Sequence, residues 1–438
     1  MKYIYWGLFW VGVYLGLILM PSIALFLGPM PAGSGLWWDL SIALGFAGTS
    51  MMGVMFFLTA RFKRASFPFG IDLIYYFHRQ IALIAFSFLL AHPVIMVAQN
   101  PGLLSELAPQ AISGYLLAGV GSIAALLALV ITSLFRKQLK LHYDGWRIWH
   151  ALLAVAAFVL AIIHIEGVAN YVAMPLRKGL WTVIMASWIL LLFYIRLIKP
   201  FHLSRLPYRV EKVIKERGDA WTLVLSPDGH LGLRFLPGQF CWLTLWSSPF
   251  ALKEHPFSIS SSAEAPEKLH FTIKALGDFT RRIKNVLPRQ RAYLDGPYGS
   301  FSIDRHHVGS YCFIAGGIGI APIMGMLRTL ADRRESRPLT LIYAYNTLER
   351  LTFYEEIEGL KKKLPLTVIY VLFSPPDGWQ GERGFITEEL LQAQLPKNRE
   401  DTQCFVCGPV PMIQLAEKSL HRLGVPLAHI HSELFDLV

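Results

Sequence analysis

Four histidines stand in two long apolar stretches of the sequence, where an ionisable side chain is costly and needs a partner. His78 and His92 lie fourteen residues apart in one stretch, and His150 and His164 have the same separation in another. Fourteen residues advance an α-helix by about 21 Å and return the side chain to within about 40° of the same face. Each helix therefore presents two imidazoles on one face, at two matched depths.

Two imidazoles at one depth are the ligands of a metal with two axial positions. Haem iron is commonly held by axial histidine, so the duplicated spacing predicts two haem sites. A structural zinc site needs four clustered ligands and is a poorer fit. The alternative for each histidine taken alone is a hydrogen-bonded residue in the core of a helical bundle.

The 438 residues are 54% hydrophobic, more apolar than an ordinary soluble protein. The apolar residues are concentrated before residue 200, where six segments are each near the length that a bilayer crossing needs. The expected spans are residues 3–27, 37–59, 72–98, 112–134, 146–170 and 178–198. We expect the first span to be retained, because its apolar run is longer than that of a signal peptide.

Lysine and arginine in the short loops predict the orientation of these spans. One side carries Lys2, Arg61, Lys63, Arg64, Arg136, Lys137, Lys140, Arg147, Arg196 and Lys199. The other side carries only Arg177 and Lys178. Both termini are therefore expected in the cytoplasm of a multi-pass cell-membrane protein. The net charge of +11 then reflects membrane topology, and no nucleic-acid partner is needed to explain it.

In this orientation the two histidine-bearing spans run in the same direction. His78 and His150 then share the cytoplasmic level, and His92 and His164 share the outer level.

The second half of the chain changes pattern. From Tyr208 to about Asp304, short strands alternate with turn signals, which predicts a small antiparallel barrel. From about Tyr311, strands alternate with helices, which predicts a parallel doubly wound sheet. The expected domains are residues 1–200, 205–305 and 306–438.

Two strand-to-turn transitions in the last domain could receive a nucleotide. Gly316, Gly317 and Gly319 permit a tight turn before a helix whose N-terminus favours phosphate. The alternative is a structural turn. The segment "CGPVPM", residues 407–412, is a second such transition. Cys404 and Cys407 stand in a strand, which puts them on opposite faces and disfavours a shared metal.

These motifs, taken in order, resemble the ferric reductase and NADPH oxidase superfamily over nearly the whole chain. The resemblance is carried by the histidine pairs, "HPFSISS" at 255–261, "GDFT" at 277–280, "DGPYGSF" at 295–301, "GGIGIAP" at 316–322 and "CGP" at 407–409. It implies a six-helix all-α membrane bundle followed by a ferredoxin-reductase-like module. That module would hold an antiparallel β-barrel FAD domain and an α/β doubly wound nicotinamide domain.

The resemblance also implies roles for individual residues. FAD would be bound by His255, Pro256, Phe257, Ser258, Lys274 and Thr280, with Ser258 near the flavin N5 edge. NAD(P)H would be bound by Gly316, Gly317, Gly319, Pro322, Asn346, Cys407, Gly408 and Pro409. The catalytic residues would be Ser258, Cys407 and Phe435, and the haem ligands the four histidines.

The implied activity is electron transfer from cytoplasmic NAD(P)H through FAD and two b-type haems to an extracytoplasmic acceptor, a ferric complex or dioxygen, the latter giving superoxide. The alternative is a membrane conduit that delivers electrons to a dedicated protein partner or to quinone. Membrane lipid surrounds the first domain in either case, and a protein partner is not required by the first alternative.

Two positions depart from the family pattern. Relatives that use NADPH carry an arginine where this chain has Asn346, so NADH is expected to serve at least as well, unless Arg350 takes that role. Animal oxidases carry a histidine one turn beyond the outer ligand, where this chain has Met96. Oxygen as the acceptor therefore has less support from the sequence.

Overall fold

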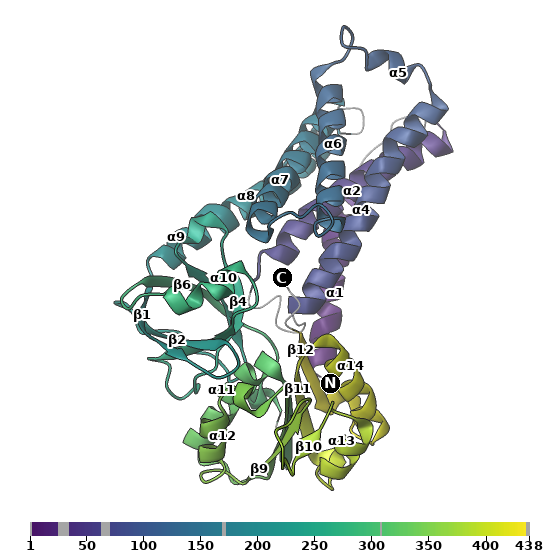
Figure 1. Ribbon diagram of the computed structural model, residues 1–438. Coiled ribbons are helices and arrows are strands. Elements are labelled where there is room, and N and C mark those ends of the chain that lie inside the picture. Colours follow the sequence, from purple (N-terminus) through teal and green to yellow (C-terminus); the bar gives the residue numbers. More distant parts are fainter. Residues whose placement is uncertain (1, 25–34, 63–70, 169–171, 307–308, 435–438) are drawn as a thin grey trace. The chain divides into compact units, whose positions relative to one another are not determined.

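The structure, a computed structural model, describes residues 2–24, 35–62, 71–168, 172–306 and 309–434 (Figure 1). The chain divides into two compact units, one made of the helices before Pro200 and the other of the chain from Phe201 onward. We describe each unit by itself.

The first unit is a bundle of long apolar helices. Its elements are α1 (Lys2–Ala24), α2 (Leu36–Thr59), α4 (Ile71–Gln99), the short α5 (Leu103–Glu106), α6 (Gly114–Leu134), α7 (Tyr143–Val168), α8 (Pro175–Phe193) and α9 (Lys199–Ser204). Within the described residues, five helices are long and apolar enough to cross a bilayer, and α1 adds a shorter apolar run over Tyr5–Met20. The all-α helical bundle of the sequence prediction is confirmed.

Two details of that prediction change. The last helix continues beyond the predicted end at residue 198, because a π-helical turn, Tyr194–Ile198, joins α8 to α9 without a break. The short α5 was not predicted. The predicted end of the first span, near residue 27, lies outside the described residues.

Small residues bring neighbouring helices of the bundle close together. The Ser122 hydroxyl on α6 donates a hydrogen bond to the Ala157 carbonyl on α7 at 2.7 Å. A Cβ added at Gly48 on α2 would lie 2.6 Å from Leu89 Cγ on α4. The histidine-bearing helices α4 and α7 thus each have a close neighbour, α2 and α6 respectively.

The second unit begins with an antiparallel barrel of six strands. The elements are β1 (Tyr208–Lys215), β2 (Ala220–Pro227), β3 (Phe240–Leu245), β4 (His255–Ser258), β5 (Leu269–Lys274), α10 (Asp278–Arg281) and β6 (Arg291–Tyr298). The strand order is β4-β3-β6-β1-β2-β5. An antiparallel bridge between Ile259 and Phe271 joins the two edges, so the barrel closes beside the end of β4.

The rest of this unit is a parallel sheet with helices on both faces. Its elements are β7 (Ser310–Gly316), α11 (Ile320–Asp332), β8 (Leu339–Tyr345), α12 (Tyr354–Leu360), β9 (Leu366–Leu372), β10 (Glu382–Arg383), α13 (Glu388–Gln394), β11 (Thr402–Gly408), α14 (Val410–Arg422) and β12 (Ile430–Leu434). The strand order is β10-β9-β8-β7-β11-β12, and every pairing is parallel.

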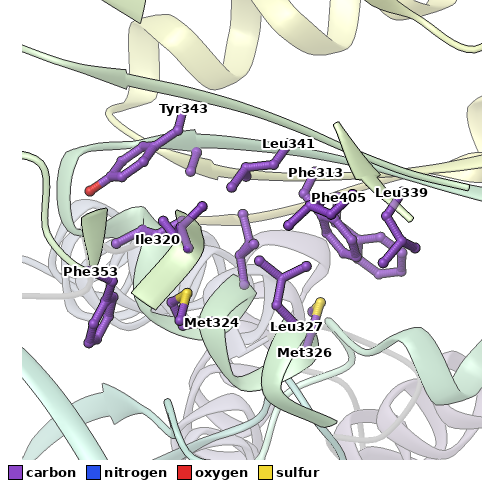
Figure 2. Close-up of a cluster of buried hydrophobic side chains, with 14 of the residues drawn as sticks. Phe313, Ile320, Met324, Met326, Leu327, Leu339, Leu341, Tyr343, Phe353 and Phe405 are labelled. Carbon is purple, nitrogen blue, oxygen red and sulfur yellow. The ribbon is translucent and has the colours of Figure 1, made fainter. Parts of the chain in front are cut away.

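A separate hydrophobic cluster covers each face of the parallel sheet. Side chains of α11 pack on one face with Phe313, Tyr343 and Phe405 (Figure 2). Ile357 and Leu360 of α12 belong to the same cluster. Side chains of α13 and α14 pack on the other face. This is the doubly wound arrangement that the alternating pattern predicted. The chain leaves β7 toward β8 and later returns to the opposite side of β7 as β11, so the order reverses between β7 and β11. Ligands of such sheets bind at the carboxyl ends of the strands at this point.

Candidate functional site

The four histidines meet in two pairs between α4 and α7. The ring centroids of His78 and His150 lie 6.3 Å apart, and those of His92 and His164 lie 6.4 Å apart. Each pair joins one histidine from each helix. The structure therefore brings together the residues that the sequence placed at common depths.

This separation fits one metal ion held between two imidazoles. A metal–imidazole bond is about 2.0 Å long, and a five-membered ring with bonds of about 1.33 Å has a radius of about 1.1 Å. When each ring points one nitrogen at the same ion from opposite sides, the distance between the two centroids is the sum of two bonds and two ring radii. That sum is about 6.2 Å. Among the described residues, no group of three or more histidine, cysteine or acidic side chains could hold a metal ion. The pairs therefore suit an ion with two axial protein ligands, such as haem iron.

Neighbouring helices orient three of the four imidazoles. His92 Nδ1 donates to the Ser41 carbonyl on α2 at 2.9 Å, and His164 Nδ1 donates to the Tyr115 carbonyl on α6 at 3.0 Å. A carbonyl can only accept, so Nδ1 carries the proton in both rings and Nε2 keeps its lone pair for a metal. Such outer partners are typical of metal-binding histidines.

At the other level, His150 Nδ1 lies 3.1 Å from Ser133 Oγ on α6. The Ser133 hydroxyl donates to the Leu129 carbonyl, so its oxygen is free to accept from the imidazole. His78 Nδ1 is buried and has no hydrogen-bond partner among the described residues.

Glycines make room for the imidazoles of the His92 and His164 pair. A Cβ at Gly119 would lie 2.7 Å from His164 Nδ1, and one at Gly45 would lie 3.4 Å from His92 Cγ. The sequence analysis missed Ser41, Ser133, Tyr115 and both glycines. The only local signal was that serine and glycine interrupt otherwise apolar helices.

The proposed flavin motif forms β4, the first strand in the spatial order of the barrel. Ser258 pairs with Phe240 of β3, and its buried Oγ has no hydrogen-bond partner among the described residues. His255 packs against Phe279 with ring centroids 3.9 Å apart, and Phe257 stacks on Phe279 at 6.0 Å. Pro256 and Phe257 remain partly exposed. An unsatisfied buried hydroxyl beside partly open apolar rings fits contact with the edge of a flavin.

Lys274 and Thr280 occupy different places near this strand. Lys274 ends β5, and its Nζ lies 5.2 Å above the ring of Tyr345 in the parallel-sheet domain. The Thr280 hydroxyl accepts from the backbone N–H groups of Leu276 and Gly277, at 2.9 and 2.8 Å. Thr280 therefore shapes the turn before α10, which sequence reasoning did not anticipate, while the Lys274 ammonium can meet a negatively charged group.

The two glycine-containing turns of the parallel sheet meet where the strand order reverses. A Cβ at Gly319 would lie 2.2 Å from the Cys407 carbonyl oxygen, and one at Gly408 would lie 3.0 Å from Gly316 Cα. Gly317 has a φ of +55°, in the left-handed region that favours glycine. Pro322 lies in the first turn of α11. The two backbones therefore approach each other closely at the point where a nucleotide is expected.

Cys407 is a neutral thiol in this arrangement. Burial, together with the nearby Glu433 carboxylate, raises the pKa of Cys407 well above its usual value. A protonated thiol is a poor nucleophile, so the structure favours contact with the ligand over covalent chemistry. Cys404 packs on the opposite face of β11, in the other hydrophobic cluster.

Asn346 is the exposed residue directly after β8, and Pro409 follows β11. The Arg350 guanidinium, near Asn346 in sequence, is paired with Asp219 of the barrel at 3.0 Å. Phe435, which the family resemblance assigned a catalytic role, lies outside the described residues. The preceding strand, β12, pairs its Leu434 with Gly408.

Replacement of Ser258 by alanine is expected to slow hydride transfer from NADH to FAD while FAD remains bound. The hydroxyl is buried and has no hydrogen-bond partner among the described residues, so its removal should leave the fold intact and remove only the expected contact with the flavin. Stopped-flow reduction of the flavin, with FAD content measured on the same samples, checks this expectation. Ser260→Ala is the matched control, because that hydroxyl is engaged with Thr272 at 2.9 Å. Equal rates for wild type and Ser258→Ala would contradict the assignment.

Three protein-family models match consecutive parts of the chain. Residues 44–162 match the ferric reductase like transmembrane component, residues 222–302 an FAD-binding domain and residues 313–418 an oxidoreductase NAD-binding domain. The first match covers His78, His92 and His150 and ends two residues before His164. The order of the three matches is that of the helical bundle, the barrel and the parallel sheet.

Individual proteins are similar to this chain over half or more of its length. The chain is 28% identical to a glycine betaine monooxygenase reductase subunit from Chromohalobacter salexigens over 236 residues, which are 52% of this chain and 63% of the relative. It is 27% identical to NADH-cytochrome b5 reductase 1 from Pyricularia oryzae, over 68% of this chain and 97% of the relative. A solved cytochrome P450 reductase from Amycolatopsis is 24% identical, with a TM-score of 0.47, over 52% of this chain and 69% of that one.

Proposed function

Because the chain belongs to the ferric reductase and NADPH oxidase superfamily, we propose that it carries electrons from NADH through FAD and two b-type haems across a membrane. The acceptor on the far side is a ferric complex or dioxygen. That the chain is a membrane oxidoreductase with FAD and NAD domains follows from the three matched families. The haems, the direction of transfer and the acceptor are the proposal.

The observation that carries the proposal is the spacing of the histidine pairs. Both centroid separations, 6.3 and 6.4 Å, fit an iron ion with two axial imidazoles. On each helix the two histidines are fourteen residues apart. The two pairs are therefore separated by about 21 Å along the helix axes. Two haems in this arrangement would divide the thickness of the membrane into two steps.

The residues of the chain position the cofactors, which supply the redox chemistry. Bound FAD accepts a two-electron hydride and releases single electrons, and bound haem iron carries one electron at a time. The Ser41 and Tyr115 carbonyls hold the imidazoles of His92 and His164 by Nδ1, so that Nε2 of each ring keeps its lone pair for a metal. The Ser258 hydroxyl is available to the flavin edge, and the turns at Gly316 and Cys407 accommodate the nucleotide.

The loop charges support a cytoplasmic position for the FAD and NADH domains. Most lysines and arginines of the short loops are on the same side of the expected spans as the segment after residue 198. The positive-inside rule assigns that side to the cytoplasm. NADH is a cytoplasmic donor in this arrangement, and the His92 and His164 level faces the outside.

Anaerobic addition of NADH to the purified protein tests the proposal. FAD should be reduced first and haem absorbance should change next, with two haems per polypeptide. Ferric chelate or oxygen, added afterward, should reoxidise both. Absence of haem from freshly purified protein, or haems that stay oxidised beside reduced FAD, would refute it. If reoxidation needs quinone or a protein that copurifies, the chain is instead a conduit to that partner.

NADH is expected to be used at least as well as NADPH, and Asn346→Arg is expected to shift the preference toward NADPH. Asn346 is exposed at the carboxyl end of β8 and offers only neutral groups, which suit a ribose hydroxyl. A guanidinium there can bind a 2′-phosphate in bidentate fashion. The expected change in relative kcat/KM is about tenfold to a hundredfold, since each 1.4 kcal/mol is a factor of ten. The named cofactor of the NADH-cytochrome b5 reductases supports the same preference.

Steady-state kinetics with both nucleotides at fixed ionic strength measure this preference. Asn346→Gln is the control, because it keeps the amide and adds no charge. A wild-type protein that strongly prefers NADPH would show that Asn346 does not set the specificity.

A further inference from the structure

The turn between β1 and β2 lies against the segment that follows β8. The Tyr345 hydroxyl donates to the Gly218 carbonyl at 3.2 Å, and the Thr352 hydroxyl donates to the Arg217 carbonyl at 3.0 Å. Gly218 has a φ of +74°, and a Cβ there would lie 2.4 Å from the Arg350 carbonyl oxygen. The barrel turn is thus seated directly on the parallel-sheet domain.

This contact lies beside the turn that is expected to receive the nucleotide. A Cβ at Gly317 would lie 4.0 Å from the Tyr345 ring, and the Tyr343 hydroxyl donates to the Gly317 carbonyl at 3.3 Å. Tyr345 therefore has the glycine turn near its ring and the barrel turn at its hydroxyl. Asn346 is the next residue. In dinucleotide-binding sheets, the residues after the neighbouring strand meet the adenosine ribose, where NADH and NADPH differ.

Arg350 forms an ion pair with the barrel at this point. Arg350 Nη2 lies 3.0 Å from Asp219 Oδ2, and the two side chains are 50% and 68% exposed. An ion pair this exposed adds little to stability. It nevertheless changes what the guanidinium can do, because the carboxylate occupies one of its donor nitrogens and places a negative charge beside any incoming phosphate.

We propose that Asp219 of the FAD barrel excludes NADPH by neutralising Arg350 at the edge of the nucleotide site. A 2′-phosphate would compete with the carboxylate for Arg350 and would be repelled by it. The ribose hydroxyl of NADH carries no charge, so NADH is unaffected by the pair. The inference rests on the proposed function, in which this site takes NADH, and it assigns part of the specificity to a residue outside the nucleotide domain.

Asp219→Asn tests the inference with little disturbance of the turn. Asp219 has a φ of +58°, which asparagine also tolerates. We expect kcat/KM for NADPH relative to NADH to rise by about twofold to fivefold, with the NADH value almost unchanged. Adding Arg350→Ala to Asp219→Asn should remove the gain. Glu355→Gln is the matched control, because it breaks the Arg217–Glu355 ion pair in the same interface and should leave the ratio as it is.

A binding measurement separates this inference from the proposed function. Calorimetric titration of the FAD-loaded protein with ADP and with adenosine 2′,5′-bisphosphate needs neither haem nor acceptor. The bisphosphate should gain affinity in Asp219→Asn by a similar factor, and the gain should shrink as salt is raised. An unchanged ratio, a gain that survives Arg350→Ala, or an equal gain in Glu355→Gln would overturn the inference alone. Failure of both nucleotides to bind the wild type would overturn the proposed function and the inference with it.

Discussion

Replacement of His92 or His164 by leucine is expected to remove one haem and leave the other in place. Each variant leaves a single imidazole of the His92 and His164 pair, while the ring centroids of His78 and His150 remain 6.3 Å apart. The haem content should fall from about two to about one per polypeptide. Flavin reduction by NADH should persist, since the FAD and NADH residues belong to the other unit. NADH-driven reduction of ferric chelate should be lost.

Haem content by pyridine haemochrome and flavin reduction by stopped flow provide the two measurements. His202→Leu is the matched control, because His202 is an exposed histidine on α9 that belongs to neither pair. It should keep both haems. Full haem content in the His92 and His164 variants would rule out these two residues as ligands, and loss of FAD together with haem would point to general misfolding.

Replacement of Gly319 by alanine is expected to abolish rapid flavin reduction by NADH. The added Cβ would lie 2.2 Å from the Cys407 carbonyl oxygen and 2.8 Å from the Gly408 nitrogen. These are backbone atoms of a central strand, so the two turns must move apart. A displacement of about 1 Å can lower a rate by about a hundredfold, and overpacking of this kind costs about 1 to 3 kcal/mol of stability.

Flavin reduction rates, FAD content and thermal unfolding of the same preparations test this expectation. FAD should stay bound and should still be reduced by dithionite, because the barrel is unchanged. Gly359→Ala is the control, since Gly359 in α12 has open space around it and alanine favours a helix. Normal reduction by NADH in Gly319→Ala would show that the close contact between the two turns is not needed for the nucleotide.

Local periodicity made much of the architecture predictable. The alternation of strands and helices after Tyr311 predicted β7, α11, β8 and β9, because the spacing of apolar residues within each segment is typical of a strand or of a helix. The same reasoning placed Cys404 and Cys407 on opposite faces of β11, where the structure has them. The ends of helices were harder to predict from the sequence. The last helical segment extends to Ser204, because a π-helical turn continues it into residues that are less apolar.

The sequence by itself determined which face each histidine takes, since fourteen residues return a helix nearly to the same side whatever surrounds it. Only the tertiary structure decided which groups hold the imidazoles. Ser41 and His92 are 51 residues apart, and Tyr115 and His164 are 49 apart. Helical periodicity fixes the face that a residue takes but not the axial offset between two helices, and a hydrogen bond near 3 Å depends on that offset. The pairing of Asp219 with Arg350, across 131 residues and two domains, was hidden from the sequence for the same reason.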